Sequence, residues 1–176
     1  MEQIINKMSN NLGKKEALYS SSSFPQDISD PRFEKVKSVF RKFPGKRLLD
    51  IGCFDGTFTY SLKEFFDELY GVDILEKAVK LAKNKGIKVF QIDVEEENLP
   101  FEDNFFDRVF CGETIEELYN PDHLLDEIYR ILKPGGDCRY NNSQFSKLCK
   151  SPCSPFWIST LSDKHRFKIQ YRKIFI

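Results

Sequence analysis

The chain contains 176 residues, of which 40% are hydrophobic, and this length and composition suit one domain with a sizeable core. Its 27 basic and 27 acidic residues leave no net charge, which argues against a nucleic-acid or anionic-membrane partner and favours a small-molecule partner. No apolar run is long enough for a membrane span, and the N-terminus lacks the features of a signal peptide, so we expect a cytoplasmic protein.

Residues 1–30 are rich in Asn, Ser, Lys and Gln, and we expect an N-terminal lid or flexible segment there. Asp30 and Pro31 then form a helix start, because Asp is a favoured N-cap and Pro is favoured at the first helical position. An apolar stripe at helical spacing follows and stops at Pro44 and Gly45, which predicts an amphipathic helix.

Strand and helix signals alternate through the next 90 residues or so. Apolar segments bounded by turn residues predict strands over 47–52, 69–74, 88–93 and 107–113. Helical stripes predict helices over 58–66, 75–86 and 121–132, with Gly86 and Asn120-Pro121 as punctuation. This alternation indicates an α/β fold with a doubly wound, mostly parallel, Rossmann-like sheet in the strand order 3-2-1-4.

Five cysteines are an odd number for a disulfide framework. Cys53 and Cys111 lie at predicted strand ends, where small semi-apolar side chains pack well, and we expect them to be free thiols. Cys138, Cys149 and Cys153 lack the paired spacing or nearby histidine of a zinc site, so no metal is predicted.

Carboxylates stand at the ends of three successive predicted strands: Asp50, Asp73 and Asp93. Singly, each would be interpreted as a solvated charge, but in open parallel sheets ligands bind outside the carboxyl ends of the strands. Gly52 and Gly56 flank a tight turn before a helix N-terminus, which could attract a carboxylate or phosphate. Asp73, 21 residues after Gly52, could accept hydrogen bonds from two ribose hydroxyls.

These segments resemble a known family. "LLDIGCFDGTFTYSL", "YGVDILEKAVKLAKNKG", "IDVEEENLPFEDNFFDRVFCGETIEEL" and "NPDHLLDEIYRILKPGG" are similar to the consecutive motifs of the class I S-adenosylmethionine-dependent methyltransferases, in the type-11 branch that includes ubiquinone-biosynthesis enzymes. The resemblance covers residues 47–136 and implies S-adenosylmethionine as cofactor, a small-molecule acceptor and a methyltransferase core over residues 31–136.

The resemblance also implies a role for particular residues. The turn from Gly52 to Gly56 would wrap the methionine portion of the cofactor, Asp73 would hold the ribose, and Asp93 with the Val94 backbone would contact the adenine. Asp50 would orient the turn or the cofactor amino group. The complete set of implied cofactor-binding residues is Asp50, Gly52, Cys53, Phe54, Gly56, Asp73, Ile74, Asp93, Val94, Cys111 and Glu113.

The chain departs from the family pattern at two places. Phe54 occupies the middle glycine of the family's glycine turn, and Glu116-Glu117 stands where relatives often have an acid followed by histidine. No catalytic base is assigned. Tyr19 and Phe24 are candidate lid residues, with packing favoured for Phe24, and His123 is interpreted as a surface histidine.

The pattern ends at Gly136. The family's fifth strand should follow as an apolar run, but "DCRYNNSQFSK" contains none, and only "FKIQYRKIFI" at 167–176 alternates like a strand. We therefore expect residues 137–176 to form an irregular tail, with the C-terminal strands missing and the fourth strand exposed at its edge. Two explanations stay open, a divergent extension or a shifted reading frame near Asp137, and the second is favoured because the pattern vanishes at one point.

Three functions follow from these observations. The first is methyl transfer from S-adenosylmethionine to a small-molecule acceptor. The second is a truncated or catalytically inactive cofactor-binding module. The third, an NAD-dependent dehydrogenase, is disfavoured because the turn lacks the spacing G-x-G-x-x-G. Oligomeric state is not predicted.

Overall fold

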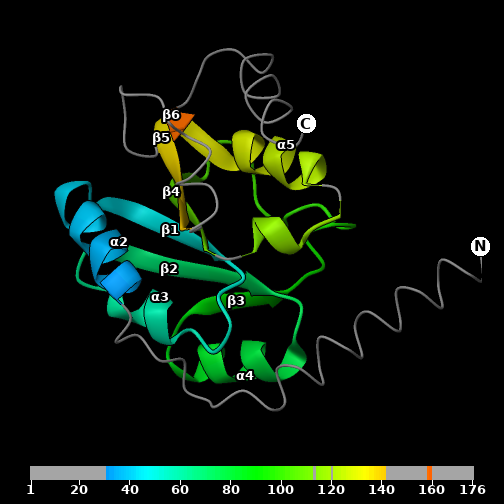
Figure 1. The fold of residues 1–176 in the computed structure, drawn as a ribbon, viewed down its shortest axis with the longest axis horizontal. Coiled ribbons are helices and arrows are strands. Elements are labelled where there is room, and N and C mark those ends of the chain that lie inside the picture. Colours follow the sequence, from blue (N-terminus) through cyan, green and yellow to red (C-terminus); the bar gives the residue numbers. More distant parts are fainter. Residues whose placement is uncertain (1–30, 113, 120, 142–157, 160–176) are drawn as a thin grey trace, which may run out of the picture.

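The computed structural model describes residues 31–112, 114–119, 121–141 and 158–159. A six-stranded sheet in the order β3-β2-β1-β4-β5-β6 forms its centre (Figure 1). The strands are β1 (Gly45–Ile51), β2 (Phe66–Asp73), β3 (Lys88–Gln91), β4 (Phe106–Gly112), β5 (Leu132–Asn141) and β6 (Ile158–Ser159). The first five are parallel and β6 is antiparallel to β5, which confirms the predicted order of the first four strands.

Helices cover both faces of this sheet. They are α2 (Pro31–Lys42), α3 (Thr57–Ser61), α4 (Glu76–Asn84) and α5 (Asp122–Ile131), with a short 3-10 helix η1 (Ile115–Glu117). Successive strand residues point to opposite faces, so Leu49 and Ile51 of β1 join the core beneath α5, while Leu48 joins a core with α2 and α3. The α/β doubly wound prediction is confirmed. Within the described ranges, no helix is long and apolar enough to cross a bilayer.

The predicted elements α2 and α4 form close to their expected limits. In α4 the side chains of Ala78, Val79 and Ala82 are buried, and the exposed face carries an ion pair between Glu76 and Lys80 at 2.6 Å. Gly86 ends the segment with φ +84°, a left-handed conformation that glycine adopts without steric cost. The amphipathic pattern and the stop signal were therefore sufficient here.

The helix predicted over 58–66 is wrong at its C-terminal end. Helix α3 stops at Ser61, and Phe66 is the first residue of β2, where it is buried against α2. Phe40 of α2 packs edge-on against Phe66 and Phe110, with ring centroids 5.4 Å and 6.1 Å apart. The apolar residues after Ser61 lie in a turn and at the start of β2, where they pack into the core. Their spacing resembles that of a helical stripe although they are not in a helix.

The irregular tail and open fourth-strand edge are also wrong near Gly136, because residues 132–141 form β5 parallel to β4. The register is irregular between Phe106 and Arg108, and Gly135, at φ +81°, lies in the part of β5 opposite this irregularity, before regular pairing resumes at Asp137. A strand pairs through its backbone groups, so only the side chains that point into the core need be apolar. In β5 Cys138 is such a side chain, buried in the core opposite Val109. Residues 167–176 lie outside the described residues, and the reading-frame shift stays a prediction.

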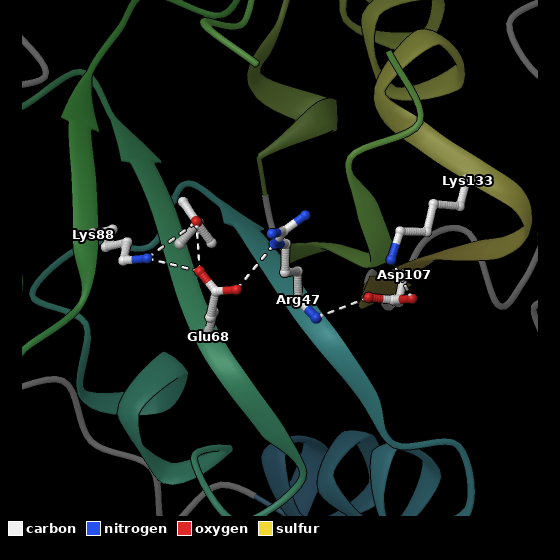
Figure 2. Close-up of polar contacts among 6 residues, drawn as sticks. Arg47, Glu68, Lys88, Asp107 and Lys133 are labelled. Atoms are coloured by element: carbon white, nitrogen blue, oxygen red, sulfur yellow. Dashed lines mark hydrogen bonds and ion pairs between the residues drawn. The ribbon is translucent and has the colours of Figure 1, made fainter. Parts of the chain in front are cut away.

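Alternating charges link the amino ends of the strands (Figure 2). Glu68 of β2 accepts hydrogen bonds from Lys88 of β3 at 2.7 Å and from Arg47 of β1 at 3.0 Å. Asp107 of β4 accepts from the Arg47 backbone N–H at 2.9 Å and from Lys133 of β5 at 2.8 Å. We call these five residues the amino-end charge ladder. It lies at the opposite end of the sheet from the predicted ligand-binding edge.

Candidate cofactor site

Asp50 occupies the carboxyl end of β1 and is almost fully buried, at 3% exposure. Its side chain lies on the face covered by α3, where the Thr59 hydroxyl donates a 2.6 Å hydrogen bond to Oδ2. Burial raises the pKa of Asp50 to about 7, the negative charge of Asp73 adds to this, and the Thr59 hydrogen bond opposes it. Asp50 is thus a buried acid whose ionised form the protein stabilises only in part.

Asp73 ends β2 beside Asp50. Its two carboxylate oxygens accept from the backbone N–H groups of Phe54 at 2.8 Å and Leu75 at 2.9 Å. Burial raises the pKa of Asp73, while these backbone hydrogen bonds lower it. The Ile74 N–H is a third backbone donor to this carboxylate. A carboxylate has about four acceptor positions, so some acceptor capacity remains for a ligand. Among the described residues, neither Asp50 nor Asp73 forms an ion pair.

The turn between β1 and α3 fits closely against its surroundings. Gly52 and Gly56 have φ +74° and +73°, and both sites leave no room for a side chain. A Cβ at Gly52 would overlap the Thr114 hydroxyl, and one at Gly56 would lie 2.6 Å from Ile87 Cδ1 and 2.8 Å from Ala82 Cβ. The predicted glycines are therefore required by the packing of the turn.

Most backbone donors of the turn are already used within the chain. The N–H groups of Gly52 and Cys53 donate to Val72 O at 2.9 Å and 3.1 Å, and that of Gly56 donates to Cys53 O at 2.9 Å. The Phe54 N–H donates to Asp73. These four donors are therefore satisfied within the chain, and the attraction of a carboxylate or phosphate to the helix N-terminus stays a prediction. The two adjacent carboxylates, Asp50 and Asp73, favour a cationic group.

Phe54 replaces the family's middle glycine without breaking the turn. It adopts φ +49°, a conformation that costs a non-glycine residue about 1–2 kcal/mol. Its N–H bond to Asp73 offsets part of this cost because hydrogen bonds to charged groups are stronger than neutral ones. The substitution thus preserves the link between the turn and the end of β2.

Sequence reasoning missed Asp55, which joins the turn to the start of α3 and the end of α4. Asp55 is buried and accepts from the Thr57 N–H at 3.0 Å and the Thr57 hydroxyl at 2.8 Å. Lys85, at the end of α4, donates to the Asp55 carbonyl at 2.8 Å. A short acid-x-Thr sequence before a helix is the signal that could have identified this turn, in which the Asp side chain accepts from the backbone two residues on.

Thr114 was missed as well. It follows β4, and its hydroxyl lies within hydrogen-bond distance of two carbonyl oxygens, Ile51 O at 3.2 Å and Gly112 O at 3.1 Å. Thr114 therefore closes the site over Gly52. Nothing in its local sequence indicates this position, because the contact joins residues 62 apart in the chain.

The chain after β3 brings Asp93 to the same edge, since the Ile92 N–H donates to Asp73 O at 3.0 Å. Asp93 closes a turn: its Oδ1 accepts from Glu95 N–H at 3.1 Å, and its N–H donates to Glu97 Oε1 at 2.9 Å. Val94 is buried in the core beneath α5. The strand ends at Gln91, two residues before Asp93, so Asp93 lies on a loop.

Other predicted residues have different surroundings. Cys111 is buried in the core beneath α5, and Cys53 packs where a Gly71 side chain would be. Neither forms a disulfide, as predicted. Burial raises the pKa of Cys53 well above the usual value for a cysteine, so its thiol is not activated. Ile74 is half-buried, and its carbonyl accepts from Gln91 Nε2 at 3.1 Å.

Some predictions concern residues outside the described ranges. These residues are Tyr19, Phe24, Asn120, Cys149, Cys153 and Glu113, the last of which was predicted to bind the cofactor. His123, expected at the surface, is half-buried and its Nε2 lies 3.1 Å from Glu97 O. Cys138, the remaining cysteine considered for zinc, is buried in the core and forms no disulfide.

With this geometry established, comparison with known proteins identifies the class. The methyltransferase domain family matches residues 49–139, and the chain belongs to this family, whose cofactor is S-adenosylmethionine. The matched range contains the end of β1, all of β2 to β4, the glycine turn and most of β5. Membership confirms the resemblance found in the sequence and removes the support for a dehydrogenase.

Relatives within the family carry different functions. The chain is 33% identical to the demethylmenaquinone methyltransferase of Staphylococcus saprophyticus, with 77% of this chain and 60% of that enzyme covered. It is 34% identical to the mitochondrial arginine-hydroxylase NDUFAF5 of Mus musculus, over 63% of this chain and 32% of that protein. The chain spans about half the length of the curated relatives it matches.

Solved structures share the fold. The crystal structure of a Thermotoga maritima S-adenosylmethionine-dependent methyltransferase, described as a possible histamine N-methyltransferase, matches with a TM-score of 0.53 and 25% identity. The match covers 78% of this chain and 59% of that one.

Proposed function

We propose that this protein binds S-adenosylmethionine at the carboxyl ends of β1 and β2 and transfers its methyl group to a small-molecule acceptor. The observation that supports this most directly is the pair of buried carboxylates, Asp50 and Asp73, which lack ion pairs within the described residues and flank a tight glycine turn. The cofactor supplies an activated methyl group on a positively charged sulfur. A small-molecule acceptor is consistent with the demethylmenaquinone named for the Staphylococcus relative.

In this proposal Asp73 uses its remaining acceptor positions for two ribose hydroxyls. The turn from Gly52 to Gly56 wraps the methionine portion, and its two glycines keep the turn tight against Thr114 and Ile87. Asp50, held by Thr59, places negative charge beneath the cationic end of the cofactor. Asp93 and the Val94 backbone contact the adenine, and Ile74 and Cys53 complete the wall. Cys111 supports the site from the core, and Glu113 stays a prediction.

The chain's contribution to catalysis is orientation. Holding the acceptor in line with the methyl group and excluding water accounts for much of the acceleration such a site can provide. We assign no general base, because the position of the acceptor is not defined. An acceptor that loses its proton only after transfer would need none.

Calorimetric titration with S-adenosylmethionine and S-adenosylhomocysteine tests the binding site. Replacing Asp73 by Ala should weaken binding by about 1–3 kcal/mol through loss of a charge-assisted acceptor. Asp107→Ala, which removes a carboxylate from the amino-end charge ladder, is the control and should leave affinity unchanged. Equal affinities for wild type and Asp73→Ala would exclude the ribose assignment.

Transfer of a radioactive methyl group from S-adenosylmethionine to quinol-like and amine acceptors tests the activity. Label should appear in an acceptor only with the intact protein. Tight cofactor binding without transfer to any acceptor would be consistent with the proposed binding site but would contradict the proposed methyl transfer. That outcome would support the inactive cofactor-binding module.

A further inference from the structure

The loop between β3 and β4 is attached to α5 along most of its length. At its end, the Asn104 N–H donates to Arg130 O at 3.0 Å, and the Phe105 N–H donates to Ile131 O at 2.8 Å. These two bonds use carbonyl groups at the C-terminal end of α5, which have no partners within the helix. The loop is therefore fastened to the helix and not only to the strands it connects.

Arg130 makes the densest set of contacts with this loop. Its guanidinium donates to Leu99 O at 2.9 Å, to Phe101 O at 2.6 Å and to Asp103 Oδ1 at 2.9 Å. A planar guanidinium has five donors in a fixed arrangement, so it can hold three loop positions at once. A lysine at this position could not satisfy all of them.

Glu127 completes the contact from the preceding turn of α5. It is 8% exposed, and its Oε2 accepts from the Leu99 N–H at 2.8 Å. Its two oxygens also accept from Arg130 Nε at 2.9 Å and from the Arg130 terminal nitrogen at 2.8 Å. The Arg130 hydrogen bonds hold the pKa of Glu127 below its usual range. Leu99 is thus bound through both its N–H and its C=O.

His123, at the start of α5, reaches the part of the loop nearest the site. Its Nε2 lies 3.1 Å from Glu97 O, so the Nε2-protonated ring donates there. Glu97 in turn donates its N–H to Asp93 O at 2.8 Å and accepts from the Asp93 N–H at 2.9 Å. A continuous set of hydrogen bonds therefore runs from α5 to Asp93.

We infer that His123, Glu127 and Arg130 are positioning residues for the base of the cofactor. Through the loop 93–103 they hold Asp93 and Val94 where these residues can recognise the exocyclic amino group of adenine. This inference rests on the proposed function and adds to it a set of residues that do not contact the cofactor. The three residues together are called the α5 clamp.

A positioning role makes a prediction that a purely structural role does not. A carboxylate acceptor selects adenine, whose exocyclic amino group donates, over hypoxanthine, which has a carbonyl at the same place. The wild-type protein should bind S-adenosylhomocysteine about tenfold or more tightly than S-inosylhomocysteine, since a hydrogen bond to a charged group has about this value. If the clamp orients Asp93, loosening the clamp should reduce this preference.

The experiment measures both affinities by calorimetry for four proteins. Arg130→Lys keeps the charge beside Glu127 but loses the fixed array of donors. His123→Leu removes one contact at the half-buried start of α5. Arg47→Lys is the matched control, because the same substitution breaks the 3.0 Å bond to Glu68 in the amino-end charge ladder. Thermal unfolding of each protein establishes that it is folded.

We expect the preference for S-adenosylhomocysteine to fall to about threefold or less in Arg130→Lys and His123→Leu and to be retained in Arg47→Lys. His123→Leu carries the test if Arg130→Lys does not fold. A retained preference in both folded clamp variants would overturn the inference, as would the absence of any preference in the wild type. Failure of the wild type to bind either compound would instead overturn the proposed function itself.

Discussion

Asp50 gives the protein an unusual dependence of stability on pH. Its folded-state pKa of about 7 lies above the unfolded value near 4, so the folded protein binds a proton more tightly than the unfolded chain. Its effect is thus most favourable below about pH 4 and is lost as the pH rises to about 7. We expect this single group to lower the free energy of unfolding by a few kcal/mol across that window.

Asp50→Asn should remove this dependence, because the amide keeps an acceptor for the Thr59 hydroxyl and has no charge to desolvate. The measurement is urea unfolding at pH 5 and pH 8, with the variant more stable than wild type at pH 8. Asp107→Asn is the control, since the pKa of Asp107 is lowered and its loss should not stabilise the protein at pH 8. An Asp50→Asn protein with the wild-type pH dependence would contradict the assignment.

Gly52 and Gly86 allow the cost of backbone conformation to be separated from the cost of crowding. Both have positive φ, +74° and +84°, but a Cβ at Gly86 would meet nothing within 4 Å, whereas one at Gly52 would overlap Thr114. Gly86→Ala should destabilise by about 1 kcal/mol, and Gly52→Ala by at least about 2 kcal/mol more. Urea unfolding measures both.

Adding Thr114→Ala to Gly52→Ala removes the overlapping hydroxyl and should recover part of the lost stability. Cofactor affinity, measured on the same proteins, should fall for Gly52→Ala and not for Gly86→Ala. Equal destabilisation by the two glycine substitutions would show that Thr114 does not close the site.

At the scale of the elements, β5 is the feature that a residue pattern did not reveal. Its pairing with β4 predicts that position 138 cannot accept a charge, since Cys138 is 1% exposed. Cys138→Asp should therefore destabilise by about 3–5 kcal/mol, the typical cost of a buried charge without a partner. Lys46→Asp, at an exposed strand position, should cost about 1 kcal/mol or less.

The test is urea unfolding of the two variants beside wild type. A Cys138→Asp protein as stable as Lys46→Asp would mean that β5 does not pack in the core. The irregular tail expected from the sequence would then begin at residue 137 after all.

The sequence predicted those elements whose apolar residues repeat regularly and whose ends carry turn residues. Helix α4 and strands β1 to β4 meet both conditions, and the strand-end carboxylates Asp50 and Asp73 followed directly from them. The prediction was wrong where burial came from tertiary contacts, at Phe66, and where backbone pairing replaced an apolar pattern, in β5. Thr114 and Arg130 act on residues distant in the chain, and local spacing contains no information about such contacts.

At the scale of the whole molecule, the two ends of the sheet have opposite electrostatic character. The amino ends carry the charge ladder, in which every charge has a partner, while the carboxyl ends carry Asp50 and Asp73 without ion pairs among the described residues. The ion pairs are thus concentrated at one end of the sheet and the unpaired carboxylates at the other.

The pKa of Glu68, an acidic member of the ladder, is lowered to about 2, owing first to the hydrogen bond from Lys88 and then to those from Tyr70 and Arg47. Its stabilising effect is complete above the unfolded pKa near 4.5 and is lost as the pH falls towards 2. Glu68→Gln should therefore be less stable than wild type at pH 6, and the difference should shrink between pH 4.5 and 2.

Urea midpoints of the two proteins at pH 6, 4 and 3 provide the measurement, and the contribution of Asp50 cancels because both contain it. The difference should also decrease in 1 M salt, since exposed charges are screened. Glu102→Gln, on an exposed part of the β3–β4 loop, is the control and should show no such difference. A difference between wild type and Glu68→Gln that is constant with pH would exclude the ladder as its source.

The position of β1 between β2 and β4 has a consequence for how the chain folds. Arg47 meets Glu68 across 21 residues but meets Asp107 across 60 residues. Closing the longer loop costs about 1 kcal/mol more in chain entropy, so the sub-sheet β1-β2-β3 can assemble before β4 reaches it. Glu68 can then bind the Arg47 side chain before the Arg47 backbone N–H meets Asp107. We therefore expect the docking of β4, followed by β5, to be the slow step in the folding of this domain.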